Sequence, residues 1–150
     1  MRRAIVALAI TLAAGSATAS DKTDVMATVN QFIDGFNKGD VKSALATCAS
    51  PVSIVDEFPP FAWQGPTACA DWATDFEANA RKDQITGSVV TLAKPKHVVV
   101  AADRAYVVVK ADYKYKLKGK KVSQKGATMT VALQKSAAGW RITGWAWATG

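Results

Sequence analysis

Apolar residues recur at intervals of three and four positions in the first half of the chain, which is the spacing of one buried helix face. Three segments show this spacing, and each predicts a helix. The first stops at Gly39, Asp40 can cap the second, and Pro66 opens the third. The apolar positions are Val25, Met26, Val29, Phe32, Ile33 and Phe36 in the first segment, Val41, Ala44, Leu45 and Cys48 in the second, and Cys69, Trp72, Ala73, Phe76 and Ala80 in the third.

The period changes to two after Asp83, which indicates strands that bury one face. Strands are predicted at residues 98–101, 105–117, 122–134 and 140–148. Two shorter strands are predicted between the second and third helices, at residues 52–55 and 61–63. Helices that precede a run of consecutive strands favour an α+β fold with an antiparallel sheet over a parallel α/β fold.

The first 19 residues have the three parts of an export signal. Arg2 and Arg3 give a positive start, residues 4–14 are apolar, and the run Ala-Thr-Ala that ends at Ala19 matches a cleavage signal. A buried N-terminal helix fits this pattern less well. No apolar run reaches the roughly 20 residues of a membrane-spanning helix. We therefore expect a cleaved signal peptide, residues 1–19, and one domain, residues 20–150, in the periplasm or outside the cell.

The two cysteines, Cys48 and Cys69, can be interpreted in two ways. In an oxidising compartment they could form a disulfide, which would contribute about 3 kcal/mol by closing a loop of roughly 20 residues. The alternative is two buried free thiols. Two cysteines 21 positions apart and a single histidine, His97, do not make a metal site. No cofactor motif is present, so neither a metal nor a cofactor is expected.

Charge is divided unevenly along the chain. Residues 20–83 contain ten acidic and five basic residues, whereas residues 84–150 contain two acidic and 12 basic residues. Lysines concentrated on the long predicted hairpin have a simple interpretation, a solvated outer face that discourages strand pairing between molecules. The alternative is contact with anionic polymers or lipid head groups. Nucleic-acid binding is not expected. The lysines are Lys110, Lys114, Lys116, Lys118, Lys120, Lys121 and Lys125.

Three short motifs occur in an order that resembles the nuclear transport factor 2-like superfamily, and its SnoaL-like branch in particular. They are Phe-Asn-Lys-Gly-Asp at residues 36–40, Trp-Gln-Gly at residues 63–65 and Gly-Trp-Arg-Ile at residues 139–142, and they span the domain. The resemblance implies a cone-shaped, curved antiparallel sheet wrapped around three helices of the N-terminal half. It also implies a pocket at the wide end and homodimers formed through the sheet. The fold hosts enzymes, ligand binders and interaction domains, so it does not decide the function.

Asp56 matches the catalytic base of the ketosteroid isomerases in this superfamily. A carboxylate beside Phe58 and Trp63 could have a raised pKa and remove a proton next to a carbonyl. The residues that would stabilise the enolate oxygen differ, however. Phe32 occupies the position where the resemblance implies a tyrosine, and Thr130 lies near the position where it implies a second aspartate. Losing one oxyanion donor typically lowers the rate by about 100- to 1,000-fold, so steroid isomerisation is disfavoured. The alternative is that Asp56 is a loop carboxylate that accepts backbone hydrogen bonds.

The aromatic residues are candidates for a pocket wall as well as for the core. In the last predicted strand, Trp140 and Ile142 occupy even positions and Trp145 and Trp147 odd positions, so strict alternation places the two pairs on opposite faces. If Trp140 and Ile142 face inward, the other two tryptophans lie on the outer face and mark a homodimer interface. With the opposite parity, those two tryptophans fill the pocket. The predicted pocket residues are Phe32, Phe58, Trp63, Trp72, Phe76, Tyr113 and Thr130.

Two functions follow from these observations. The first is the binding of a small apolar ligand, or an accessory role as a dimer, without chemistry. The second is a cofactor-free isomerase or lyase, similar to a ketosteroid isomerase or a polyketide cyclase, that uses Asp56 as general base.

Overall fold

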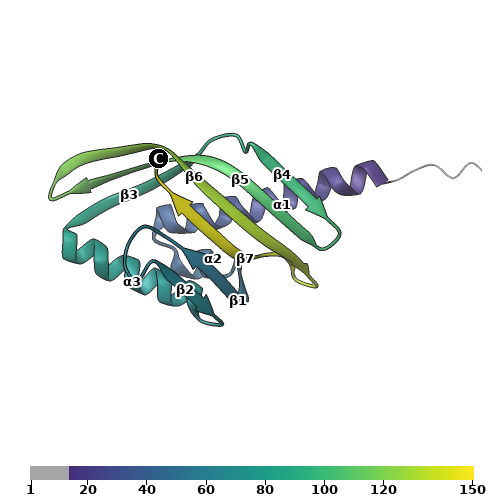
Figure 1. Ribbon diagram of the computed structural model, residues 1–150, viewed down its shortest axis with the longest axis horizontal. Helices are drawn as coiled ribbons and strands as arrows, with labels where there is room; N and C mark the ends of the chain where they lie inside the picture. Colours follow the sequence, from purple (N-terminus) through teal and green to yellow (C-terminus); the bar gives the residue numbers. More distant parts are fainter. Residues whose placement is uncertain (1–13) are drawn as a thin grey trace, which may run out of the picture.

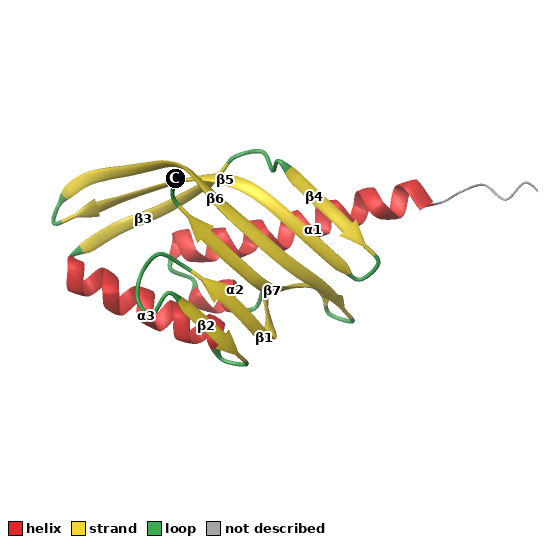
Figure 2. Ribbon diagram, in the orientation of Figure 1, coloured by secondary structure: helices red, strands yellow, loops and turns green. Residues whose placement is uncertain are grey.

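The computed structural model describes residues 14–150, so residues 1–13 of the predicted signal peptide lie outside the described part. The three predicted helices are present, and they lie on one face of a curved sheet whose other face carries no helix (Figures 1 and 2). The helices are α1 (Ala14–Lys38), α2 (Val41–Leu45) and α3 (Ala68–Asp83). The strands are β1 (Cys48–Val55), β2 (Ala62–Gly65), β3 (Ile85–Leu92), β4 (His97–Ala101), β5 (Arg104–Leu117), β6 (Lys120–Ser136) and β7 (Gly139–Ala148).

The seven-stranded sheet has the order β2-β1-β7-β6-β5-β3, and β4 pairs with the first part of β5. The predicted α+β fold with a curved sheet is confirmed. The sheet is mixed rather than antiparallel throughout, because β1 and β7 run parallel while the other pairs are antiparallel. Hairpin turns fix only the direction of consecutive strands. Most of the domain separates β1 from β7, so no turn determines how these two strands pair.

Two local predictions need correction. Cys48 was assigned to the second helix and Pro51 to its end, but α2 stops at Leu45 and both residues belong to β1. The pairing of β1 with β7 is interrupted between Cys48 and Ser53, so the missing N–H group of Pro51 falls where no regular ladder exists. Strand β3 was not predicted, because a glycine interrupts it and only Val90 in it is buried.

The helices are fixed to the sheet by a few specific contacts. Cys48 and Cys69 form a disulfide, which joins β1 to the first turn of α3. Asn37, at the end of α1, donates from Nδ2 to the carbonyl oxygen of Val90 (2.8 Å) and accepts from the N–H of Val90 at Oδ1 (2.7 Å). Asp40 caps α2 by accepting from the N–H of Ser43 (3.0 Å). The disulfide thus fastens α3 to β1 and the two Asn37 hydrogen bonds fasten α1 to β3, whereas the Asp40 cap fixes the start of α2.

A bulge in β7 decides which way its tryptophans point. Ile142 pairs with Leu133, and Gly144 pairs with Ala132, so Thr143 is an extra residue between them. Trp145 and Trp147 therefore project to the same inner face as Ile142, not to the outer face.

The predicted dimer interface at Trp145 and Trp147 is accordingly wrong as to its residues, since Trp145 is only 6% exposed. Strict alternation, on which that prediction rested, fails where one residue is added to a strand.

The contact between α1 and α2 depends on a glycine. A Cβ atom at Gly35 would lie 2.7 Å from the backbone nitrogen of Ala44 and 2.9 Å from its Cβ. An alanine in an exposed helix stabilises a protein relative to glycine. Here the sign reverses, because the two helix backbones must separate to admit the methyl group.

We predict that Gly35→Ala lowers the free energy of unfolding by about 1–3 kcal/mol, as measured by urea denaturation. Asn30→Ala, on the exposed side of the same helix, is the matched control and should change it by less than about 0.5 kcal/mol. Equal stability of Gly35→Ala and the native protein would contradict the close approach of α1 and α2.

Candidate functional site

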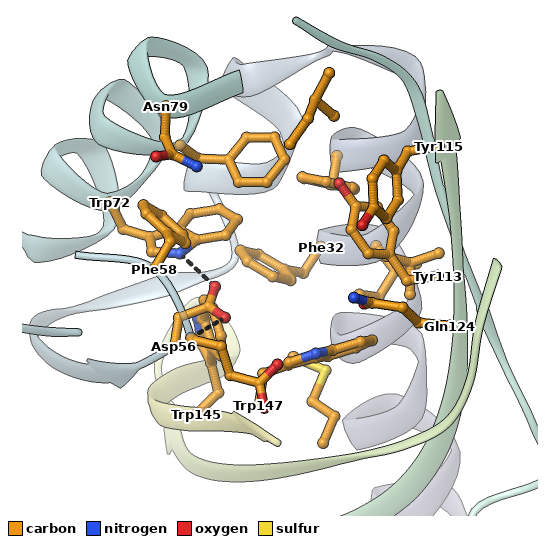
Figure 3. A pocket seen from close by; sticks show the side chains of 17 residues that line it. Phe32, Asp56, Phe58, Trp72, Asn79, Tyr113, Tyr115, Gln124, Trp145 and Trp147 are labelled. Atoms are coloured by element: carbon orange, nitrogen blue, oxygen red, sulfur yellow. Dashed lines mark hydrogen bonds between the residues drawn. The ribbon is translucent and has the colours of Figure 1, made fainter. Parts of the chain in front are cut away.

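An aromatic cavity of about 180 Å³ lies between the helices and the inner face of the sheet. Its wall is formed by α1, α3, the loop after β1, and strands β3, β5, β6 and β7 (Figure 3). Most of its lining is apolar, which is typical of a small-molecule site. The lining residues are Phe32, Ile33, Phe36, Asp56, Glu57, Phe58, Trp72, Phe76, Asn79, Ile85, Val90, Tyr113, Tyr115, Gln124, Met129, Trp145 and Trp147.

Asp56 is the polar centre of this wall. It follows the last residue of β1, and its backbone N–H donates to the carbonyl oxygen of Phe61 (3.0 Å), which closes the loop. Its Oδ2 accepts from Nε1 of Trp72 (2.9 Å), and its Oδ1 accepts from the N–H of Glu57 (2.7 Å). Each carboxylate oxygen keeps a further lone pair. The loop and α3 thus hold the carboxylate at the cavity while leaving acceptor capacity for another group.

Burial raises the pKa of Asp56 above its ordinary value of 3.8. The hydrogen bonds from Trp72 and from the N–H of Glu57 act in the opposite direction because they favour the charged form. The negative charge of Glu57 adds a smaller increase in the pKa. Asp56 therefore resists ionisation more than a solvated aspartate does, which is a property of many site carboxylates.

The predicted pocket residue Trp63 does not line the cavity. Its Nε1 donates to Oδ2 of Asp75 on α3 (2.8 Å), which holds the indole between β2 and α3. Its ring packs behind Phe58, at a centroid distance of 5.0 Å. Trp63 thus supports the wall from outside, and Phe58 forms the wall itself.

Thr130 is also displaced from its predicted place. Its neighbours in β6, Met129 and Val131, are buried on the inner face, so Thr130 projects to the outer face. It therefore cannot replace the second aspartate that the resemblance implies. The structure does bring Phe32, Trp72, Phe76 and Tyr113, together with Phe58, onto the cavity wall.

Polar groups other than Asp56 lie at the remainder of the wall. The hydroxyl group of Tyr113 shares a hydrogen bond with Ser88 Oγ (2.8 Å), and burial raises the pKa of Tyr113 above 10.0. Glu57 is held at the rim by Thr149, whose N–H and Oγ1 donate to Oε1 at 2.6 and 2.8 Å. Asn79 and Gln124 add two side-chain amides.

Helix spacing carries a usable signal for one of these missed residues. Asn79 follows Trp72 and Phe76 by seven and three positions, so it shares their helix face. Gln124 gave none, because a second bulge lies between it and the buried Ala127. Gly126, with φ of 71°, occupies this bulge, and its N–H donates to Oδ1 of Asp112 (3.0 Å).

Within the described residues 14–150, no group of His, Cys, Asp and Glu side chains is arranged to hold a metal ion. None of the helices in the same range is long and apolar enough to cross a membrane.

The comparisons with known proteins agree with this geometry. A family model of the SnoaL-like domain matches residues 25–146. This chain belongs to the SnoaL-like domain family. No curated protein matches this chain.

Solved structures share the fold of this SnoaL-like protein at low sequence identity. A nuclear transport factor 2-like protein from Novosphingobium aromaticivorans has a TM-score of 0.74 at 16% identity, covering 91% of this chain and 86% of the other. One from Salmonella enterica has a TM-score of 0.74 at 15% identity, covering 88% and 92%. A ketosteroid isomerase-like protein from Erwinia carotovora has a TM-score of 0.67 at 17% identity, covering 86% and 95%. At such identities the likeness shows the fold alone.

The hydrogen bond from Trp72 generates a prediction about the pKa of Asp56. In Trp72→Phe this bond is absent, so we expect the pKa to rise further above 3.8. Trp63→Phe is the matched control, since it removes the equivalent bond to Asp75 and should leave the pKa of Asp56 unchanged. NMR titration of the Asp56 carboxyl carbon measures both effects.

The same shift has a consequence for stability. Because the folded protein binds the Asp56 proton more tightly than the unfolded chain, the contribution of this group to stability decreases as the pH rises from 3.8 through the folded pKa. A folded pKa at or below 3.8 would contradict the buried placement of the carboxylate.

Proposed function

We propose that this SnoaL-like protein binds a small molecule about the size of one six-membered ring, with the ring among the aromatic side chains and a polar group at Asp56. The observation that carries the proposal is an aromatic cavity of about 180 Å³ that contains one half-buried carboxylate. An apolar cavity of about 150 Å³ is large enough for benzene. The cavity therefore matches a single ring with a short substituent.

The same volume disfavours larger ligands. Pockets for drug-sized molecules are about 300–1,000 Å³, and a four-ring steroid is of that larger class. The rings that limit the cavity are also packed on one another: Trp72 lies 5.0 Å from Trp145 and 5.6 Å from Phe76 between centroids. Enlarging the cavity would break these aromatic contacts.

We predict that phenol and cyclohexanone quench the tryptophan fluorescence of the protein in a saturable manner and that a four-ring steroid does not. Asn79→Trp places an indole at the cavity wall and should abolish the quenching by phenol. Glu77→Trp, on the exposed surface of the same helix, should bind phenol like the native protein. Binding of the steroid, or equal binding of phenol to both variants, would show that this cavity is not the site.

A second candidate function is supported by the raised pKa of Asp56. A carboxylate that holds its proton more tightly is a stronger base when ionised, and it could remove a proton next to the carbonyl of a ring ketone. The enolate oxygen would then need a hydrogen-bond donor. Phe32 offers none and Thr130 faces outward, so the hydroxyl groups on the wall are those of Tyr113 and Tyr115.

For this second function, the protein should speed the exchange of the α-protons of cyclohexanone in D₂O, as followed by NMR. Asp56 takes a proton from the α-carbon and leaves the enolate, the proton on its carboxyl group exchanges with D₂O, and the deuteron is then returned to the α-carbon, which restores the ketone and the carboxylate. Asp56→Asn should slow the exchange by at least about 100-fold, while Asp75→Asn should not. If the native protein binds cyclohexanone but leaves its exchange at the buffer rate, the site binds without catalysis.

We further propose that the domain is exported and has Ser20 as its first residue. The disulfide between Cys48 and Cys69 supports this location, because such bonds persist in oxidising compartments. Mass measurement of the protein recovered from the envelope or medium of a producing cell tests it; an N-terminus at Met1 would contradict the proposal.

We also propose a homodimer formed through the outer face of the sheet. Val99 and Tyr106 oppose each other across β4 and β5 on that face and are 53% and 48% exposed. A gel-filtration volume that is that of a monomer, and is unchanged in Tyr106→Lys, would remove this proposal.

A further inference from the structure

The cavity wall is electrostatically one-sided. Its ionisable side chains that carry charge at neutral pH are Asp56 and Glu57, and its lining within residues 14–150 includes no lysine, arginine or histidine. Glu57 lies at the rim, and its carboxylate already accepts hydrogen bonds from Thr149. Asp56 lies deeper and retains a free lone pair on each oxygen. A guest in the cavity therefore meets negative charge without a compensating cation from the protein.

The rings around Asp56 have the same preference. Aromatic faces carry negative electrostatic potential, so they attract cations within about 6 Å of the ring centre. Phe32, Trp72 and Trp145 pack against one another beside Asp56, with centroid distances of 5.0–5.9 Å. Tyr113 lies across the cavity from Asp56 in Figure 3, and Trp147, whose ring centroid is 6.5 Å from that of Tyr113, lies at the bottom of that view. A carboxylate surrounded by aromatic rings is the arrangement that recognises ammonium groups.

The remaining polar groups of the wall can also accept hydrogen bonds. The side-chain amides of Asn79 and Gln124 make no hydrogen bond within the described residues, although both line the cavity. Each offers a carbonyl oxygen to a guest. A protonated amine needs such acceptors, because burying a charge without partners is unfavourable.

The lysines of the long hairpin do not reverse this balance. Lys114 and Lys116 alternate along β5 with Tyr113 and Tyr115, whose rings line the cavity. The two sets therefore project from opposite faces of the strand. Lys114 and Lys116 are exposed to solvent, where mobile ions screen their field over about 8 Å. The nearest fixed charge to a bound guest is Asp56.

We propose that the cavity takes an organic cation, a protonated amine or quaternary ammonium group carried on a single apolar ring. This inference rests on the proposed binding function and adds the charge of the ligand to its size. Asp56 pairs with the ammonium group, Asn79 or Gln124 accepts from it, and the rings enclose the apolar part.

Three probes of nearly equal shape separate the charge preference from binding itself: benzylamine, which is protonated at neutral pH, benzyl alcohol, which is neutral, and benzoate, which is an anion. We expect benzylamine to quench tryptophan fluorescence with an affinity about tenfold higher than that of benzyl alcohol. Benzoate should show no saturable binding, because it would place two negative charges together.

Variants assign the preference to one carboxylate. Asp56→Asn should lower the affinity for benzylamine more than the affinity for benzyl alcohol, so that the tenfold preference for the cation disappears. Glu77→Gln removes an exposed charge from α3 and should keep the preference. NMR gives an independent readout in the native protein: benzylamine should lower the pKa of Asp56, and benzyl alcohol should not.

The outcomes distinguish this inference from the function on which it rests. If benzyl alcohol binds as tightly as benzylamine, or benzoate binds best, the cation preference is wrong and a ring-binding site remains. If none of the three probes binds, both the inference and the proposed function fail. The comparison of the three probes uses the native protein, so it holds even where Asp56→Asn does not fold.

Discussion

The docking of α3 on the strands β1 and β2 is the constraint on which the cavity depends. Three links make it: the disulfide between Cys48 and Cys69, the hydrogen bond from Trp63 to Asp75, and the hydrogen bond from Trp72 to Asp56. The first two join residues that do not line the cavity, and they are structural. They fix the helix so that the third can hold a carboxylate in an aromatic wall. If α3 were not fixed, Trp72 would move with the helix and its hydrogen bond to Asp56 would break. Asp56 would then turn to solvent.

Much of the fold was predictable because it follows from periodicity. The three helix faces, the capping role of Asp40 and the long strands β5, β6 and β7 are direct consequences of apolar spacing and turn residues. The parallel pairing of β1 with β7 was not, because it is a long-range choice that no local turn encodes. Strand β3 was missed because it is held in place by hydrogen bonds to Asn37 and by its pairing with β5. Its own side chains are mostly not buried, so its sequence shows no alternation of apolar and polar residues.

The site was predictable only in part, and the failures on the sheet strands β6 and β7 at Gln124 and Trp147 have one cause. Asp56, Phe58 and Trp72 could be placed because a motif or a helix spacing marks them. The side chains of Trp147 and Gln124 face the cavity only because of bulges at Thr143 and Gly126. Each bulge reverses the face to which every residue beyond it projects. A single added residue leaves almost no trace in composition or hydropathy. Structural information was therefore needed to show that the last strand contributes tryptophans to the cavity and not to an interface.

The arrangement opposite Asp56 favours a binder over a catalyst. A base that forms an enolate needs a donor for the developing negative oxygen. The hydroxyl group of Tyr113 is shared with Ser88, so the donors left on the wall include the hydroxyl group of Tyr115, the unpartnered indole N–H of Trp145 and the side-chain amides of Asn79 and Gln124. All of these donors are neutral, and no lysine, arginine or histidine among residues 14–150 lines the cavity to offset the charge of an enolate. A cationic guest needs acceptors instead, and the wall supplies them in Asp56 and in two side-chain amides. Burial raises the pKa of Asp56 and so opposes its ionised form. A bound ammonium group would relieve that opposition, because it favours the charged carboxylate, whereas a neutral ketone would leave it unchanged.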